Sequence, residues 1–318
     1  MDTSLLLTYS SATMHDWCPR RYYWRYERGL INAAKIPAVE TGTLFHAGVA
    51  VLHDRGLSDK SLELALKATY PKKPTLKEEL RAWKKNPPVP TEAAILARFL
   101  LERYASHYGN PDLPRFKSLG AEQTFRADLP AAEELAGTPV EFAGKIDWLV
   151  DDERGELWVV ECKTAAIIDT EYLGKLPLDR QVTAYLIGAK VLLGREPNGV
   201  IYDVCGKPRT YRRAGEDYSM YLERAKLDYG MAPATFFARQ RCVRDEQQSA
   251  TYLESLCYKA RLILEARNSG YWDMHTDACF LRNRQCPYTA LCIEGETDRV
   301  LLGYERKAPH SELEQEDA

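Results

Sequence analysis

The chain has 318 residues, of which 45% are hydrophobic and 28% charged, a balance typical of a soluble globular protein with a sizeable core. The formal net charge is only −3, so no overall positive field attracts nucleic acid, although basic residues cluster locally in ways that suit phosphate. No apolar run has the length of a membrane span or a signal-peptide core, so we expect a cytoplasmic protein without membrane contact.

The first third of the chain carries helical patterns. Residues 9–35 predict an aromatic-rich helix, and residues 40–54 predict a second one. Residues 71–90 are rich in proline and lysine, and we interpret them as an insertion. Thr91 is positioned to cap a further helix, whose apolar residues recur at helical spacing. We therefore predict a helical N-terminal region over residues 1–118.

Strand patterns begin near Leu119 and continue through a predicted β-hairpin to Lys163. Asp179 is positioned to cap a helix that runs to Gly194, and a long helix is predicted over about residues 247–270. Helices first, then strands with helices interspersed, predict an α/β domain. We divide the remainder of the chain into a core over residues 119–270, a Cys-rich segment over 271–303 and a disordered acidic tail over 304–318.

The hairpin GKIDWLVDDERGELWVVECKTA carries charges on strands that are otherwise apolar. Its simplest turn is a three-residue loop with Gly155 in the left-handed conformation, and the resulting register places Asp147 opposite Glu161. Because like charges directly opposite each other destabilise a sheet, something must offset them. A divalent cation held by carboxylate oxygens does so. A salt-bridge ladder through Lys145 and Lys163 is the alternative, and the apolar residues around Glu161 favour the cation.

Several segments together resemble one enzyme family. GKIDWLV and WVVECKTA resemble the Asp and Glu-x-Lys halves of the PD-(D/E)XK nucleases. GTLFHAGV, AEQTF with Glu122, and the Gln-x-x-x-Tyr signature of RQVTAYLIGA resemble the RecB-like branch of that family, which includes phage exonucleases and CRISPR-adaptation exonucleases. WCPRRYYWRY, together with the late cysteines, resembles the set that holds an iron–sulfur cluster in this branch. The resemblance covers roughly residues 10–292, with the motifs in the family's order.

The resemblance implies a restriction-endonuclease-like α/β core, with a mixed central β-sheet flanked by helices. It also implies a deoxyribonuclease that depends on Mg²⁺ or Mn²⁺. The implied metal ligands are His46, Asp147, Glu161 and the backbone carbonyl of Cys162. Lys163 is then expected to orient the attacking water and offset charge, while Gln181 and Tyr185, on one helical face, position the nucleophile or the DNA backbone.

The resemblance assigns four of the eight cysteines to a metal site: Cys18, Cys279, Cys286 and Cys292. Thiolates bind both iron–sulfur clusters and zinc, and the resemblance favours [4Fe–4S], with zinc second and free thiols third. The chain departs from the commoner spacing of the family, because Asn283 stands where a cysteine is expected. We expect the other four cysteines to lie in the core: Cys162, Cys205, Cys242 and Cys257.

The function predicted from the sequence is a DNA exonuclease that acts on ends or single strands in recombination, repair or processing. If it is phage-encoded, it acts in the host cytoplasm. The first alternative is an endonuclease, or a CRISPR-adaptation DNA-trimming enzyme, of the same fold. The second is a non-catalytic DNA-binding recombination partner, against which the intact acidic and lysine motifs argue. A cysteine-stapled structural protein with a coincidental hairpin is the third.

Overall fold

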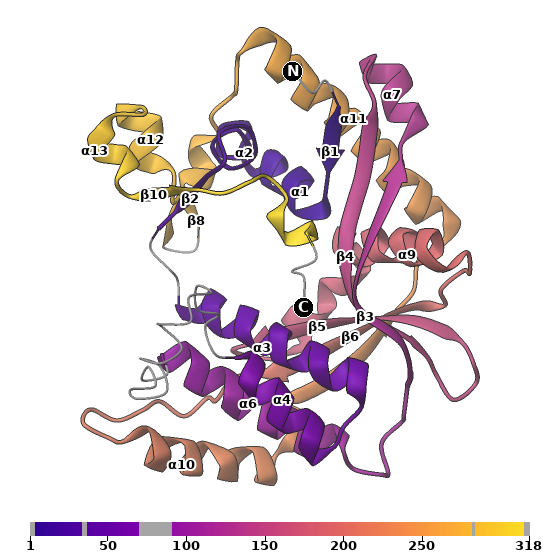
Figure 1. Cartoon of the computed structure of the whole chain (residues 1–318), viewed down its shortest axis with the longest axis vertical. Helices are drawn as coiled ribbons and strands as arrows, with labels where there is room; N and C mark the ends of the chain where they lie inside the picture. The colour runs from indigo at the N-terminus through magenta and orange to yellow at the C-terminus, as the bar shows by residue number, and fades with distance from the viewer. Residues whose placement is uncertain (1–3, 34–36, 70–90, 282–283, 315–318) are drawn as a thin grey trace, which may run out of the picture.

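The computed structural model describes residues 4–33, 37–69, 91–281 and 284–314. Its centre is a mixed six-stranded β-sheet in the order β1-β4-β5-β6-β7, with β3 on the other edge of β4 (Figure 1). The strands are β1 (Leu5–Leu7), β3 (Lys117–Asp128), β4 (Val140–Asp151), β5 (Leu157–Ala165), β6 (Gly199–Gly206) and β7 (Phe237–Cys242). Helices cover both faces of the sheet, as expected for the α/β class.

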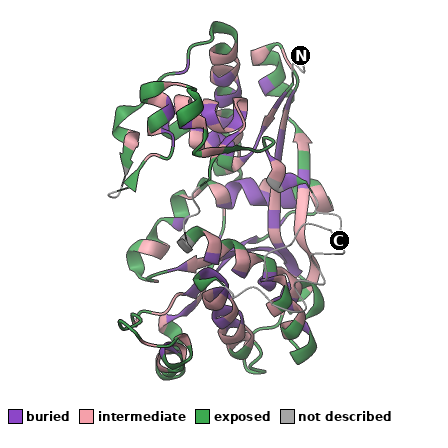
Figure 2. Cartoon of the chain, turned by 60° about the vertical axis from the view of Figure 1, so that its left-hand side comes forward, coloured by how far each residue is buried: buried purple, intermediate pink, exposed green. Residues whose placement is uncertain are grey.

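Alternating side chains divide the sheet between two hydrophobic clusters. Val159 points into one cluster, with helices α1 (Tyr9–Trp17), α7 (Pro130–Ala136), α9 (Arg180–Leu193) and α11 (Glu246–Ser269). Its neighbours Trp158 and Val160 point into the other, with α3 (Pro37–Arg55), α4 (Asp59–Ala68), α6 (Glu92–Tyr108) and α10 (Tyr218–Met231). Figure 2 shows the buried residues following the sheet and the inner faces of these helices. The period-two pattern of the strands thus supports both cores.

The predicted turns and caps are present. Gly155 has φ +74° in the loop between β4 and β5, and the strands pair in the predicted register, Trp148 opposite Val160. The side chain of Thr91 caps α6, and that of Asp179 caps α9. Gly194 ends α9 in the left-handed conformation, with φ +60°. Short-range turn and cap chemistry therefore locates these elements.

The long helix predicted for residues 9–35 is wrong. After α1 the chain turns at Cys18, whose backbone is extended at φ −166° and ψ 114°, and restarts as α2 (Pro19–Tyr22) and a π-helical turn (Tyr23–Glu27). The cause is Pro19, because a proline disfavours helical backbone at the residue before it. A short strand, β2 (Leu30–Asn32), then follows.

Disorder was expected for residues 304–318, but most of this segment is ordered in the structure. β10 (Tyr304–Arg306) pairs antiparallel with β2, and a 3₁₀ turn (Ser311–Leu313) follows. The ring of His310 stacks on Tyr26 at a centroid distance of 4.8 Å. These contacts hold the end of the described chain against its beginning. The predicted insertion at residues 71–90, and residues 315–318, lie outside the described residues. Within the described ranges, no helix is both long and apolar enough to cross a bilayer.

A buried ion pair joins three elements behind the sheet. Asp203 on β6 has a fully buried side chain and accepts a bond of 2.9 Å from the guanidinium Nε of Arg239 on β7. The hydroxyls of Tyr104 and Tyr108 on α6 donate to the two carboxylate oxygens at 2.8 and 2.9 Å. Full satisfaction of the charge by hydrogen bonds makes its burial tolerable.

We expect Arg239→Met to lower the free energy of unfolding by about 3–5 kcal/mol, because it leaves the Asp203 carboxylate buried without its counter-charge. Urea denaturation followed by circular dichroism measures this loss. The control is Arg126→Met, which removes an exposed ion pair with Glu141 and should change stability by less than about 1 kcal/mol. Similar losses for both variants would contradict a special role of the buried pair.

Candidate active site

The sheet forks along one edge of β4, and the candidate site lies at the fork. β3 occupies one edge of β4 from Glu141 to Asp151, so β1 and β5 must share the other edge. β1 pairs with residues 140–142 and β5 with residues 148–151. The intervening residues 143–147 have no strand partner on that edge within the described chain. Asp147 ends this unpaired stretch, next to the point where β5 separates from β4.

Asp147 bridges the two separating strands with its side chain. Its Oδ2 accepts a 2.9 Å hydrogen bond from the backbone N–H of Cys162, and the same oxygen lies 3.5 Å from Nδ1 of His46 on α3. Burial opposes ionisation of Asp147, but His46 and Lys163 outweigh it, so the pKa of Asp147 lies below its usual value. Burial alone would lower the pKa of His46, but the charge of Asp147 outweighs burial and raises this pKa. The Asp147 carboxylate is therefore held ionised.

Glu161 is the most buried acid of the site. Glu161 is only 1% exposed. Neither of its carboxylate oxygens accepts a well-formed hydrogen bond, although the Lys163 ammonium forms an ion pair with it. Burial, and then the neighbouring charge of Asp147, raise its pKa. Burial alone would lower the pKa of Lys163, but Glu161 and Asp147 raise it. Two carboxylates thus share one ammonium in a buried place, so ionisation of Glu161 is costly without a further cation.

Glu122 joins this group from β3. The neighbouring pairs, Ala121 with Trp148 and Gln123 with Ile146, place Glu122 opposite Asp147. Its φ of +52° lies in the left-handed region, which is uncommon and strained for a non-glycine residue. The carboxylate also forms an ion pair with Lys145. The AEQTF segment indicated the strand position of Glu122, but neither the backbone conformation nor the proximity to Asp147 is readable from the sequence.

The donor set fits a hard divalent cation. Ligand atoms of His46, Glu122 and Asp147 lie within 4.8 Å of one another. Glu161, which is not part of this group of three, offers two further buried oxygens that accept no well-formed hydrogen bond. Carboxylate oxygens, with one imidazole nitrogen, suit Mg²⁺ or Mn²⁺. The salt-bridge ladder, the alternative interpretation of the hairpin, is present in part, because Lys163 pairs with Glu161, but Lys145 pairs with Glu122 instead of Asp147. The lysines therefore do not neutralise all the acids.

Helix α9 closes the site from the Val159 face of the sheet. Gln181 Nε2 donates to the hydroxyl of Tyr185 at 2.7 Å, as their spacing on one helical face allows. Burial raises the pKa of Tyr185 well above its usual value, and the charges of Glu161 and Asp147 raise it further. The phenol therefore stays protonated and can donate a hydrogen bond next to the two carboxylates.

The four cysteines assigned to a metal site line one small cavity. Cys18 comes from the turn between α1 and α2, and the other three from the C-terminal segment: Cys279, Cys286 and Cys292. The indole N–H of Trp24 donates to Cys292 Sγ at 3.4 Å. Burial raises the pKa of Cys292, and this bond lowers it. The other four cysteines are buried in the protein, as expected: Cys162, Cys205, Cys242 and Cys257. Asn283 lies outside the described residues.

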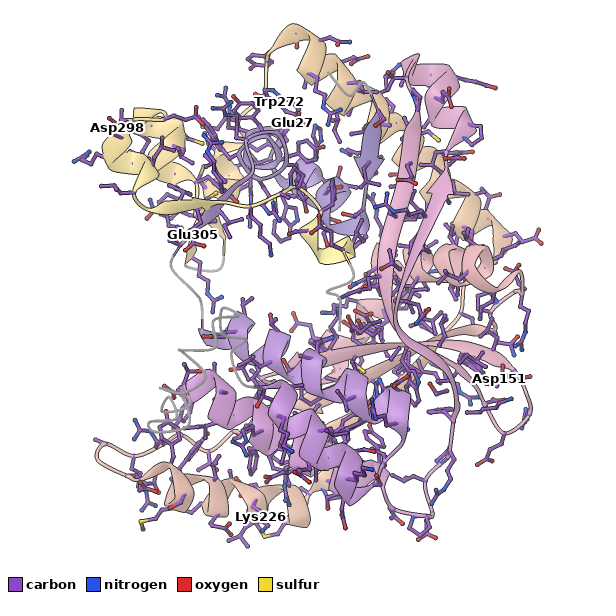
Figure 3. All side chains as sticks on the ribbon, viewed as in Figure 1. Glu27, Asp151, Lys226, Trp272, Asp298 and Glu305 are labelled. Atoms are coloured by element: carbon purple, nitrogen blue, oxygen red, sulfur yellow. The ribbon has the colours of Figure 1, made fainter. Side chains whose placement is uncertain are left out.

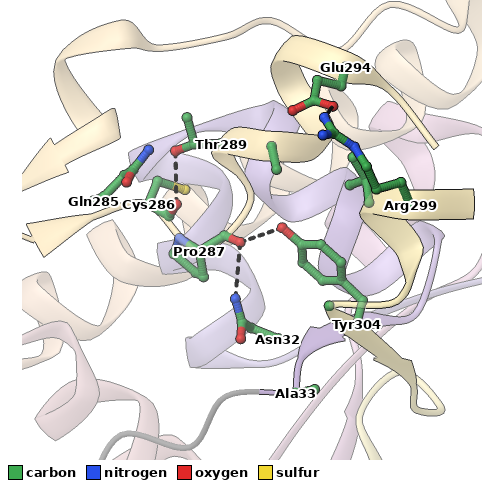
Figure 4. A pocket seen from close by; sticks show the side chains of 12 residues that line it. Asn32, Ala33, Gln285, Cys286, Pro287, Thr289, Glu294, Arg299 and Tyr304 are labelled. Carbon is green, nitrogen blue, oxygen red and sulfur yellow. Dashed lines mark hydrogen bonds and ion pairs between the residues drawn. The ribbon is translucent and has the colours of Figure 1, made fainter. Parts of the chain in front are cut away.

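The N- and C-terminal segments that carry these cysteines pack against each other. Trp272 stacks on Tyr22 at 5.7 Å. Glu27, labelled with Trp272 in Figure 3, pairs with Arg267. Next to Cys286 an open pocket separates β2 and β10 from helix α12 (Thr289–Glu294). In it, Asn32 and Tyr304 both donate to the carbonyl of Pro287 (Figure 4). Contacts between the N- and C-terminal segments therefore hold the cysteine-bearing segments together.

A family model and a solved structure match the chain. A sequence model of the PD-(D/E)XK nuclease superfamily matches residues 7–293. No curated protein shows significant similarity to the chain. A matching solved structure, described as "Putative exonuclease" from Eubacterium rectale, is 13% identical and has a TM-score of 0.41, with 92% of this chain and 94% of that chain covered.

Glu122→Gln should weaken Mn²⁺ binding at least about tenfold, because it removes a charged oxygen donor from the group around Asp147. Isothermal titration calorimetry with Mn²⁺ measures the affinity. Glu141→Gln is the matched control, since this carboxylate lies on β4 but pairs with Arg126. Unchanged Mn²⁺ affinity in Glu122→Gln would exclude Glu122 as a ligand.

Proposed function

Because the chain belongs to the PD-(D/E)XK nuclease superfamily, we propose that it is a Mg²⁺- or Mn²⁺-dependent DNA exonuclease acting on DNA ends or single strands. The observation that carries this proposal is the fork between β4 and β5, where Asp147, Glu161 and Lys163 come together. Burying two acids side by side costs free energy, and a nuclease metal centre gives this arrangement a use. The biological setting that we propose is DNA recombination, repair or processing.

Asp147, Glu161 and His46 are the proposed metal ligands, with Glu122 added from the structure and the backbone carbonyl of Cys162 from the family resemblance. A divalent ion supplies a Lewis acid for the scissile phosphate and lowers the pKa of a bound water. The backbone N–H of Cys162 fixes the orientation of the Asp147 carboxylate. The helix α3 fixes that of His46. The ligands are therefore positioned by elements from opposite sides of the fork.

Lys163 and Tyr185 are the proposed protein groups that face the reacting phosphate. The raised pKa of Lys163 keeps its ammonium charged, so it can orient the attacking water and offset charge that develops on the phosphate oxygens. Tyr185 stays protonated and is held by Gln181, so it can donate to the nucleophile or to the DNA backbone. Both groups are fixed before substrate arrives, which is the condition for electrostatic stabilisation of a transition state.

The cysteines support a second, structural proposal: Cys18, Cys279, Cys286 and Cys292 hold a [4Fe–4S] cluster. Four thiols from two distant segments line one cavity, and the Trp24 N–H already donates to one of the sulfurs. Hydrogen bonds to ligand sulfurs are a usual feature of such clusters. The role would be to tie residues 271–303 to the N-terminal region around the core of residues 119–270.

In Mg²⁺ or Mn²⁺, the wild-type protein should degrade an end-labelled linear single strand and leave a covalently closed single-stranded circle intact, because an exonuclease needs an end. Glu161→Ala should reduce degradation of the linear strand at least about a hundredfold, since it removes a proposed ligand from the reacting centre. Denaturing gel electrophoresis of timed samples measures both. Rapid cutting of the circle would favour the endonuclease alternative, and wild-type activity in Glu161→Ala would disprove the site.

Protein purified without oxygen should be brown and contain about four irons per chain. Cys18→Ala should lose the iron and lower the melting temperature, because Cys18 links segments far apart in sequence and such cross-links constrain the unfolded chain most. Iron analysis and thermal denaturation measure these changes, with Cys205→Ala, buried outside the cavity, as the control that keeps its iron. Colourless protein with one zinc would replace the cluster by a zinc site.

A further inference from the structure

The segment between β5 and α9, residues 166–179, exposes apolar side chains beside the candidate active site. Ile167 is 56% exposed and Leu178 is 86% exposed. Between them stand Tyr172, which is half-buried, and Lys175, which is exposed. The segment follows the strand that carries Glu161 and precedes the helix that carries Gln181. Tyr172 packs against the cluster that contains Val159, whereas Ile167, Leu178 and Lys175 face solvent.

A chain of neighbouring side chains connects this segment to Glu161. Glu161 on β5 is the register partner of Tyr202 on the parallel neighbour β6, so the two side chains share a face of the sheet. The ring of Tyr172 lies 6.3 Å from that of Tyr202. The Lys175 ammonium lies 4.1 Å from the centre of the Tyr172 ring. Burial raises the pKa of Tyr172, while a hydrogen bond with Tyr202 and the charge of Lys163 lower it and the charge of Glu161 raises it.

Lys175 is available to an anion, and two of the three acids of the segment are engaged, while the third, Glu171, is exposed to solvent. Asp169 accepts the backbone N–H of Tyr172 at 2.7 Å, and Asp179 accepts that of Gln181 at 2.9 Å, so both carboxylates serve as helix caps. Among the described residues, no carboxylate pairs with Lys175, whose ammonium lies over the ring. The lysine can therefore turn from the ring to a phosphate, and the ring face that it uncovers can receive a base.

We propose that residues 166–179 form a subsite for unpaired nucleotides, in which Tyr172 stacks on a base, Lys175 binds a phosphate, and Ile167 and Leu178 contact neighbouring bases. The proposal rests on the proposed nuclease function and selects single-stranded DNA, including frayed ends, as the substrate. Apolar and aromatic side chains gain little from an intact duplex, whose base faces are stacked away from solvent. On a single strand the same side chains can cover bases that are otherwise exposed to water.

The test measures binding of two fluorescently labelled probes, an oligo(dT) strand and a blunt-ended DNA hairpin, by anisotropy in EDTA. Tyr172→Ala should weaken oligo(dT) binding about five- to a hundredfold, the usual effect of one stacked base, and change hairpin binding less than about twofold. Lys175→Ala should reduce the salt dependence of oligo(dT) binding, lowering the slope of log affinity against log salt by about 0.7. Leu178→Ser should also weaken oligo(dT) binding, and it should not affect folding because Leu178 is exposed.

Two controls accompany these variants. Tyr172→Phe keeps the ring and should bind oligo(dT) like wild type. Tyr258→Ala removes an exposed tyrosine on α11 that also contacts a cation, Arg261 at 4.9 Å, and should change neither probe. Wild-type oligo(dT) binding in both Tyr172→Ala and Leu178→Ser, or equal losses on strand and hairpin, would overturn the subsite. Wild-type protein that binds neither probe would instead contradict the proposed nuclease function, and cutting of DNA in EDTA would contradict its proposed metal dependence.

Discussion

The site depends on a constraint that applies to every β-strand: it has only two edges. In β4 one edge is taken by β3, so β1 and β5 must divide the other. Between the residues of β4 that pair with β1 and those that pair with β5, backbone pairing stops, and side chains can form the hydrogen bonds instead. Asp147 does so by accepting the N–H of Cys162. The interruption thereby brings Asp147 near Glu161 without the direct cross-strand pairing that like charges disfavour.

Both hydrophobic clusters contribute to the site, so its geometry depends on the whole core. His46 comes from α3 on one face, and Gln181 and Tyr185 come from α9 on the other. Behind β6, the pair of Asp203 and Arg239 holds α6 and β7 in place. The thiol of Cys162 lies 4.0 Å from His53, which in turn contacts Tyr104 of that network. The polar groups that stabilise the fold therefore reach the strand that carries the acids.

Turn and cap residues in the sequence predicted the hairpin of β4 and β5 and the start and end of α9. The glycine at position 155 determines the turn of the hairpin, and the turn determines that Asp147 approaches Glu161. The motif order supported the family and the α/β fold. Glu122 could not be placed among the ligands, because its position depends on a left-handed residue inside a strand. Strands β1, β2 and β10 are three residues long and gain their pairing partners only from distant parts of the chain.

The failed prediction of one long N-terminal helix and the gathering of the cysteines have the same cause. Pro19 forces extended backbone at Cys18, so the helix ends there and α2 begins in a new direction, with the Cys18 carbonyl accepting the N–H groups of Arg21 and Tyr22. In a continuous helix the thiol would sit on a helical face; at the turn it lines the cavity shared with the C-terminal cysteines. The Cys-Pro pair is thus a structural device: the proline positions the sulfur that precedes it.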